Sequence, residues 1–200
     1  MQLHHSLSLA LSILRIAVRA TSLPYLNVTA VTHAGGESVL QCWQLPSPFA
    51  VSASPGVANG SYAFLGAVAN ATLTVIPARS EGGRHYAQPQ WVHFVTGLAH
   101  ITLPTASDAA WIRGGKYGLL WAGDTPDRSR GGHSTYYWEE SVTLALMTPD
   151  GEEPAHRVVR EGACLLEYLV GMAGLGVRDG VECDHLKGPQ RGYGQVNTPI

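Results

Sequence analysis

The stretch QWVHFVTGLAHITL, residues 90–103, decides the predicted fold. Two runs rich in β-branched and aromatic residues flank Thr96 and Gly97. This is the pattern of two strands joined by a tight turn, in which glycine supplies a positive φ. A two-residue turn places His93 directly opposite His100. The sequence therefore predicts a hairpin at this point of the chain.

Alternation along these two strands predicts one face that is apolar except for Gln90. The other members of this face are Val92, Phe94, Ala99, Ile101 and Leu103. We expect this face to line the interior, where a lone amide needs hydrogen-bond partners or a ligand. His93 and His100 fall on the opposite face. Two imidazoles alone rarely form a specific metal site, so we expect this pair to pack under a second sheet or at a homodimer interface.

Eight short runs have the composition of strands and are separated by Gly, Pro or Asp clusters. They are residues 39–45, 71–76, 90–96, 98–103, 118–122, 135–138, 142–147 and 155–159. Runs at this spacing predict an all-β sandwich or barrel. One short helix is expected at residues 164–172, followed by a polar tail at residues 178–200.

Composition excludes several classes of protein. The chain has 200 residues, of which 45% are hydrophobic and 14% charged, and its formal net charge is -2. This length supports one domain with a real core. A nucleic-acid partner is not expected, because it would need clustered Lys and Arg. No apolar window beyond the N-terminus is long enough to predict a membrane span.

The N-terminal residues resemble a secretory signal peptide. Residues 7–18 (LSLALSILRIAV) form an apolar run of the length of a signal-peptide core, ahead of a small-residue cleavage context at Ala20. Basic residues are missing before the run and Arg15 interrupts it, so an amphipathic leader is the alternative. We predict a signal peptide at residues 1–20 and an N-terminal segment at residues 21–38.

Asparagine usage favours passage through the secretory pathway. The chain has four Asn, and Asn27, Asn59 and Asn70 each begin an N-x-S/T sequon. The protein is therefore expected to be secreted and glycosylated. In an oxidising compartment Cys42, Cys164 and Cys183 predict one disulfide and one leftover thiol, and their spacing leaves the pairing open.

Two motifs carry a family resemblance. Residues 82–87 (GGRHYA), followed by Gln90 and Gly97, resemble the first cupin motif, and residues 130–133 (RGGH) resemble the second. Further stretches resemble small secreted cupin-like proteins of filamentous fungi: WQLPSPF (43–49), GGRHYAQPQ (82–90), VTGLAHITLP (95–104) and GLLWAGDT (118–125). The resemblance implies a cupin-like double-stranded β-helix barrel over residues 39–160, with the C-terminal helix and tail at 161–200.

The resemblance also implies a site inside that barrel. Cupin metal sites use three His and one Glu; His85 matches the first of these ligands and His133 the last. Ala87 stands at the second His position and Gln90 at the Glu position, and a carboxamide is a weaker, uncharged donor. The asparagine position of the second motif holds Tyr137. A divalent transition metal is the cofactor that the family implies, but this donor set favours metal-free chemistry.

These observations predict a secreted enzyme acting on a small organic molecule, with His85, Gln90 and His133 converging in the barrel. With metal it would be an oxygenase, decarboxylase or isomerase; without metal the two imidazoles would act as general acid and base in an isomerisation or cyclisation. Fungal natural-product biosynthesis is a setting that fits by analogy. The alternatives are a non-catalytic module that binds a sugar or metabolite, and a secreted structural or host-interaction protein.

Other polar residues are expected to have structural or solvent-exposed roles rather than catalytic ones. Asp124, in the sequence AGDT after a strand, could orient a histidine or cap a turn, and turn chemistry is the favoured interpretation. Ser134 follows His133 but lies in no nucleophile elbow. The pairs Glu139–Glu140 and Glu152–Glu153 are expected to be solvated rather than glycosidase carboxylates.

Overall fold

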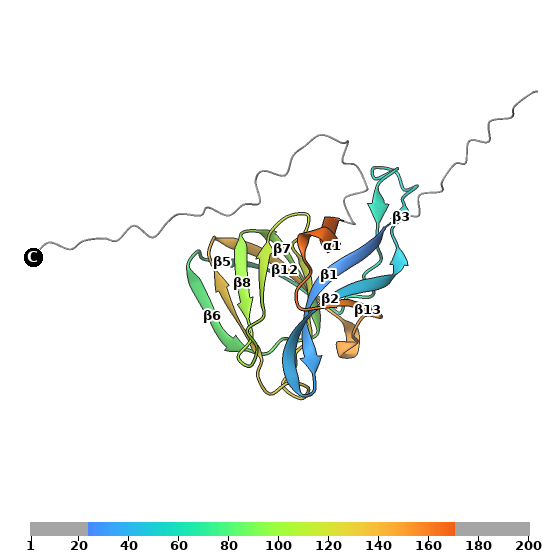
Figure 1. Ribbon diagram of the computed structural model, residues 1–200. Helices are drawn as coiled ribbons and strands as arrows, with labels where there is room; N and C mark the ends of the chain where they lie inside the picture. The colour runs from blue at the N-terminus through green and yellow to red at the C-terminus, as the bar shows by residue number, and fades with distance from the viewer. Residues whose placement is uncertain (1–23, 171–200) are drawn as a thin grey trace, which may run out of the picture.

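A computed structural model describes residues 24–170 as an all-β fold with one short helix (Figure 1). A seven-stranded sheet contains, in spatial order, β13 (Arg157–Glu161), β2 (Glu37–Pro48), β1 (Tyr25–Ala34), β10 (Leu119–Ala122), β7 (Gln90–Thr96), β12 (Ser141–Met147) and β5 (Asn70–Ile76). A four-stranded sheet contains β6 (Ser80–His85), β11 (His133–Tyr137), β8 (Leu98–Thr102) and β9 (Ala109–Arg113). The short strands β3 (Ala50–Val51) and β4 (Ser61–Tyr62) pair with each other.

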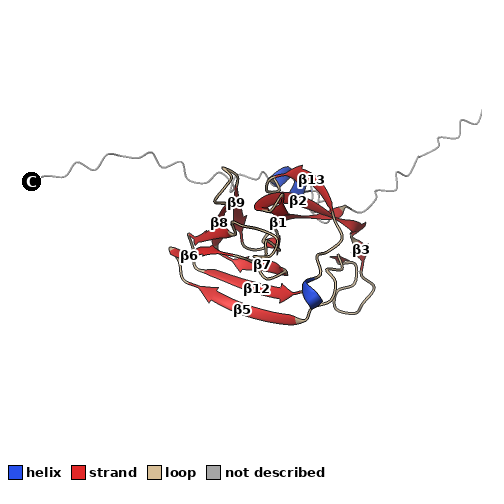
Figure 2. Ribbon diagram, turned by 90° about the horizontal axis from the view of Figure 1, so that it is seen from below, coloured by secondary structure: helices blue, strands red, loops and turns tan. Residues whose placement is uncertain are grey.

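The two large sheets lie over one another around a shared core. Figure 2 shows β7, β12 and β5 in one layer and β8 and β9 in another. Within the seven-stranded sheet, β1 pairs in parallel with β10 and antiparallel with β2. A 3-10 turn, η1 (Pro149–Gly151), follows β12, and the helix α1 (Leu166–Val170) lies in the segment where a helix is predicted.

The predicted hairpin at Thr96 and Gly97 is wrong. β7 pairs with β10 and β12, whereas β8 pairs with β9 and β11, so the chain crosses from one sheet to the other at Gly97. Gly97 has a φ of 93°, and a Cβ there would lie 2.2 Å from the Ser141 hydroxyl oxygen. Glycine permits this tight corner as readily as a hairpin turn, so the sequence signal did not distinguish them.

The predicted face alternation is confirmed, although its pairing is not. One buried cluster contains Phe94, Ala99, Ile101 and Leu103, and Val92 packs against it. A second cluster, which includes Trp43, Trp91 and Trp121, fills the opposite side of the seven-stranded sheet under residues 49, 63 and 65. Period-2 alternation therefore identified the interior face correctly.

The strands β1, β6 and β9 are absent from the sequence expectation. In β1 the polar residues Asn27, Thr29 and Thr32 are buried together with apolar neighbours, which hides the alternation of a half-buried strand. The strand β6 contains two glycines and charged side chains, which are uncommon in strands. The strands β1 and β6 form because pairing with distant strands outweighs their local propensity.

A disulfide joins Cys42 in β2 to Cys164, just before α1. This bond resolves the pairing that the sequence left open, and Cys183 lies outside the described residues, as do the leader at residues 1–20 and the polar tail. No helix in the described part of the chain is long and apolar enough to cross a membrane.

Candidate functional site

The interior cavity lies between the two large sheets and has a volume of about 290 Å³. His85 from β6, His133 from β11 and Gln90 from β7 all line it. The structure therefore places these three residues at one cavity, although 43 positions separate the glutamine from the second histidine. Most other lining side chains are apolar or hydroxyl-bearing, which suits a small organic ligand.

The two histidines face each other across neighbouring strands. His133 is the direct partner of His85 in the β6–β11 ladder, and their ring centroids are 4.3 Å apart. Gly132 makes this approach feasible: its φ is 63°, and a Cβ there would lie 2.3 Å from the His85 carbonyl oxygen. The second glycine of the RGGH motif therefore permits the geometry of the histidine pair.

Asp124 accepts a hydrogen bond from the imidazole of His133. Its side chain is completely buried, and His133 Nδ1 lies 2.9 Å from Asp124 Oδ2. Asp124 also accepts hydrogen bonds from the Ser38 hydroxyl at 2.9 Å and from the Ala87 backbone N–H at 3.3 Å. The favoured interpretation of Asp124 as a turn residue is wrong: it orients a histidine, the alternative that the sequence left open.

The buried network continues beyond the carboxylate. The hydroxyl oxygens of Ser38 and Ser129 are 2.5 Å apart, and Ser129 Oγ accepts hydrogen bonds from the backbone N–H groups of Gly131 and Gly132. Ser38 and Ser129 are both nearly fully buried. The loop that delivers His133 to the cavity is thus fixed by the same network that holds its imidazole, and satisfied buried polar networks of this kind rigidify a site.

The hydrogen-bond partners define the tautomers of both neutral imidazoles. A carbonyl or carboxylate oxygen only accepts hydrogen bonds. His85 Nδ1 lies 3.0 Å from the Gly83 carbonyl oxygen, and His133 Nδ1 faces the carboxylate of Asp124. Each Nδ1 therefore carries the proton, which leaves Nε2 of both rings with a lone pair for proton transfer.

Two tyrosines border the same cavity. Burial raises the pKa of Tyr137 above its ordinary value of 10.0, so its phenol stays neutral across the physiological range. Tyr86 donates a hydrogen bond from its hydroxyl to the carbonyl oxygen of Arg130. The Arg130 side chain in turn pairs with Glu37, with Nη2 to Oε1 at 2.5 Å. Tyr137 is therefore a neutral hydrogen-bond donor available to a cavity ligand.

The residues present do not fit the metal set that the resemblance implies. The donors lining the cavity at the matching positions are two imidazoles and the Gln90 carboxamide, and Ala87 contributes none. The nearby Asp124 carboxylate is engaged behind His133. Across residues 24–170, no group of three or more His, Cys, Asp and Glu side chains is arranged to hold a metal ion. No carboxylate is placed to balance the charge of a divalent cation in this cavity.

Other predicted residues lie elsewhere. His93 pairs with Leu119 and Leu144 in the seven-stranded sheet, whereas His100 lies in the four-stranded sheet. The expectation that they form a cross-strand pair is therefore wrong, because their strands do not pair.

The three sequons differ in exposure. Asn27 is buried; its amide nitrogen donates to the Tyr168 carbonyl oxygen at 2.8 Å and its amide oxygen accepts from Gln44 at 2.9 Å. A glycan on this nitrogen would displace its hydrogen bond to Tyr168, so we expect this sequon to stay unmodified. Asn59 and Asn70 are exposed, so both remain sterically open to modification.

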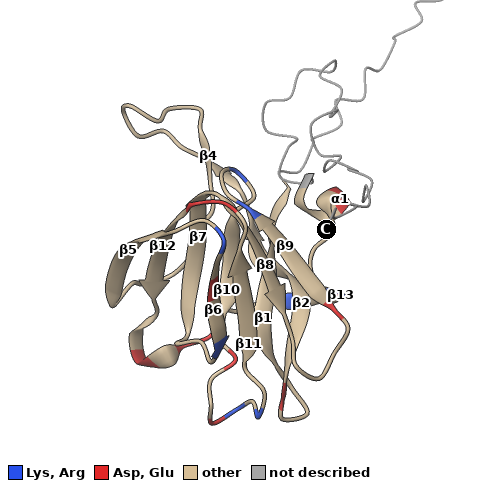
Figure 3. Ribbon diagram, turned by 90° about the vertical axis from the view of Figure 1, so that its left-hand side faces the viewer, with Lys and Arg blue, Asp and Glu red and all other residues tan. Residues whose placement is uncertain are grey.

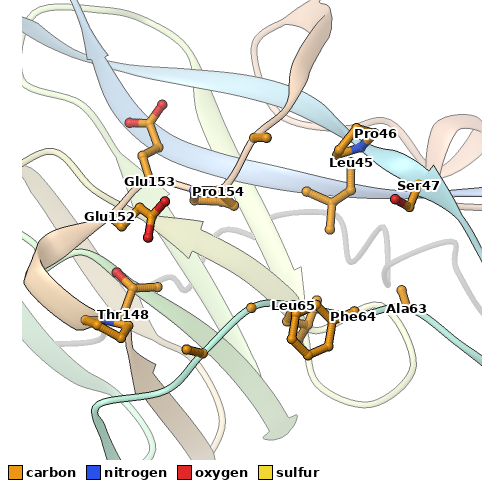
Figure 4. A pocket seen from close by; sticks show the side chains of 14 residues that line it. Leu45, Pro46, Ser47, Ala63, Phe64, Leu65, Thr148, Glu152, Glu153 and Pro154 are labelled. Atoms are coloured by element: carbon orange, nitrogen blue, oxygen red, sulfur yellow. The ribbon is translucent and has the colours of Figure 1, made fainter.

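A second hollow is a cleft of about 300 Å³. Figure 4 shows Glu152 and Glu153 on one side of it and Phe64 and Leu65 on another. Glu153 is engaged by Arg128 at 3.8 Å and by His156 at 3.7 Å. The cleft thus lacks the oriented acid–base pair of the interior cavity, which we take as the candidate site.

Comparison with protein-family models and with curated proteins finds no match for this chain.

Proposed function

We propose that the protein is a secreted enzyme that isomerises or cyclises a small organic molecule in the interior cavity, with His85 and His133 transferring protons and without a metal ion. The observation that carries this proposal is the buried hydrogen bond from His133 to Asp124, with the ring of His85 4.3 Å away. A carboxylate behind an imidazole fixes its tautomer and stabilises the imidazolium formed when it accepts a proton.

The reaction is a paired proton transfer. Nε2 of His133 removes a proton from the substrate, and the resulting positive charge is balanced by Asp124. His85 Nε2, which carries a lone pair in the neutral ring, takes a proton from water and gives it to a second position of the substrate. The substrate keeps its composition, and exchange with water returns both imidazoles to their starting states. Gln90 would orient a carbonyl or hydroxyl oxygen from the facing sheet.

A cupin-like fold is part of this proposal. The residues matching the two motifs line a common cavity between facing β-sheets, which supports the assignment. The resemblance to secreted proteins of filamentous fungi suggests natural-product biosynthesis as the setting. The Cys42–Cys164 disulfide and the exposed sequons at Asn59 and Asn70 support secretion.

Deuterium exchange tests the proposal before the substrate is known. The full secreted protein is incubated in D₂O with a panel of carbonyl compounds small enough for the cavity, and label incorporation is followed by mass spectrometry. Wild type should catalyse exchange into at least one compound, and His133→Ala should slow it by about 10² to 10⁴. His93→Ala is the matched control, because His93 lies outside the cavity lining. Exchange that His133→Ala leaves unchanged would contradict the assigned chemistry.

A non-catalytic binding module is the second candidate. Ala87 and Gln90 stand where the family has two metal ligands, an observation that favours retention of the pocket without its chemistry. Such a module would bind a sugar or metabolite from the same panel without label exchange. Replacing His133 would then change only the affinity for the ligand, and neither wild type nor His133→Ala would exchange label, which distinguishes the module from the enzyme.

A further inference from the structure

The outer face of the four-stranded sheet carries a group of adjacent aromatic rings. His100 on β8 lies between Trp111 on β9 and Tyr136 on β11 in the strand pairing, and Trp138 directly follows β11. We call these four residues the aromatic platform. They point away from the cavity, because neighbours such as Ile101 and Thr135 on the same strands line it.

Each ring of the platform contacts at least one other ring of the platform. His100 stacks on Trp111 with centroids 4.1 Å apart and an interplanar angle of 18°. Trp111 and Trp138 are 6.0 Å apart, and Tyr136 meets Trp138 edge to face at 4.9 Å. The mutual stacking fixes the orientation of the rings, so little side-chain freedom remains to be lost when a ligand binds.

The tryptophans of the aromatic platform are unusually exposed. Trp111 is 57% exposed and Trp138 50%, whereas Trp43, Trp91 and Trp121 are each at most 1% exposed. Large aromatic side chains gathered on one exposed surface mark a binding site more often than isolated exposed residues do. The four-stranded sheet therefore exposes two tryptophans to solvent on its outer face, whereas its inner face is buried in the core.

Polar side chains border the rings. Thr102 and Ser134 are paired with each other on β8 and β11, two positions from His100 and Tyr136 and therefore on the same outer face. At the opposite end Arg113 pairs with Glu139, with Nη1 to Oε2 at 3.6 Å, and both are half exposed. The platform thus combines flat π faces with neighbouring hydroxyl groups and a neutralised ion pair.

We propose that the aromatic platform is a carbohydrate-binding surface. A pyranose ring presents a face of C–H groups that packs on an aromatic plane, and its rim of hydroxyls needs hydrogen-bond partners. Trp111 and Trp138 supply the planes; Thr102, Ser134 and the Tyr136 hydroxyl supply the partners. This surface lies on the face of the sheet opposite the interior cavity, so the inference does not rest on the proposed enzymatic reaction.

The chemistry of the platform favours a glycan over a nucleic acid. Figure 3 shows β8 and β11 free of charged residues, and Arg113 is the one charged residue of β9. A nucleic acid, which also stacks on aromatic rings, would need unpaired basic residues for its phosphates. Aromatic residues are also enriched in protein interfaces, so the light-scattering measurement below separates a second copy of the chain from a glycan.

Polysaccharide pull-down with the full secreted protein tests the inference. The probes are cellulose, chitin, β-1,3-glucan and mannan, followed by calorimetry with the soluble oligosaccharide of any polymer that retains the protein. We expect at least one to bind, and Trp111→Ala and Trp138→Ala each to weaken binding about tenfold or more. Trp111→Phe keeps a ring and should retain binding within a few fold.

The control is Phe64→Ala, which removes an aromatic ring that is 82% exposed in the cleft outside the platform. It should bind as wild type does, and circular dichroism establishes that each variant is folded. Retention of wild type by none of the polymers would overturn the inference, as would equal binding by Trp111→Ala. A dimer detected by light scattering that Trp111→Ala converts to monomer, without polysaccharide binding, would assign the platform to a second copy of the chain instead.

Discussion

Replacing Asp124 with alanine should destabilise the protein by about 4 kcal/mol. The completely buried carboxylate accepts hydrogen bonds from His133, Ser38 and the Ala87 backbone N–H. Ser38 keeps Ser129 as a partner after truncation, so two buried donors are left unsatisfied. Each unsatisfied donor costs about 1–3 kcal/mol, which brackets the expected loss between about 2 and 6 kcal/mol.

Asparagine at the same position separates packing from charge. Its amide oxygen can still accept from the Ala87 N–H, while its amide N–H₂ faces Nδ1 of His133. The imidazole must then accept at Nδ1 and carry its proton on Nε2, the reverse of the wild-type tautomer. We expect Asp124→Asn to cost only about 1–2 kcal/mol, because one charge-assisted bond is replaced by a neutral one.

Urea unfolding and imidazole ¹⁵N NMR measure the two effects. Asp127→Asn is the matched control, because the Asp127 side chain is 76% exposed and its replacement should change stability by less than about 0.5 kcal/mol. The reasoning is refuted if Asp124→Ala is as stable as this control. It is also refuted if His133 in Asp124→Asn keeps its proton on Nδ1.

Three further predictions concern other parts of the molecule. Burial raises the pKa of Tyr137, so the stability present below about pH 10 is lost as the pH rises through the folded-state pKa; Tyr137→Phe should lose less stability than wild type between about pH 10 and 12 in urea titrations, and equal losses would contradict this. The Cys42–Cys164 bond joins positions 122 apart, so its reduction should lower the free energy of unfolding by up to about 5 kcal/mol, whereas an unchanged urea midpoint under reducing conditions would speak against it. Peptide mapping of protein secreted by a eukaryotic host should find a glycan on exposed Asn70 and none on buried Asn27, and a modified Asn27 would show that the described packing is incorrect.

Side-chain alternation was sufficient to predict the interior face, but it could not predict which strands pair. The pattern of Val92, Phe94 and Ile101 depends on local period-2 geometry, which holds whichever strand lies alongside. Pairing depends on partners distant in the sequence, and the Thr96–Gly97 signal is compatible with either a hairpin or a corner between sheets. Of the strands that pair with these two, β9 follows β8 directly in the chain, whereas β10, β11 and β12 are further away in the sequence.

The candidate site was partly predictable for a similar reason. His85, Gln90 and His133 could be selected because short motifs with defined spacing contain them. Asp124 could not be preferred over a turn residue, because its sequence context is that of a loop after a strand. Only the folded arrangement shows that β2 places Ser38 beside the Asp124 carboxylate and that the loop between β10 and β11 brings His133 back to it.

The central claim is that a histidine pair in the interior cavity transfers protons without a metal ion. Metal quantification by plasma mass spectrometry on purified, deglycosylated protein from a eukaryotic host tests it most directly. The account predicts a transition-metal content far below one ion per chain, unchanged in His85→Ala. One tightly held ion per chain in wild type, lost in His85→Ala, would contradict it.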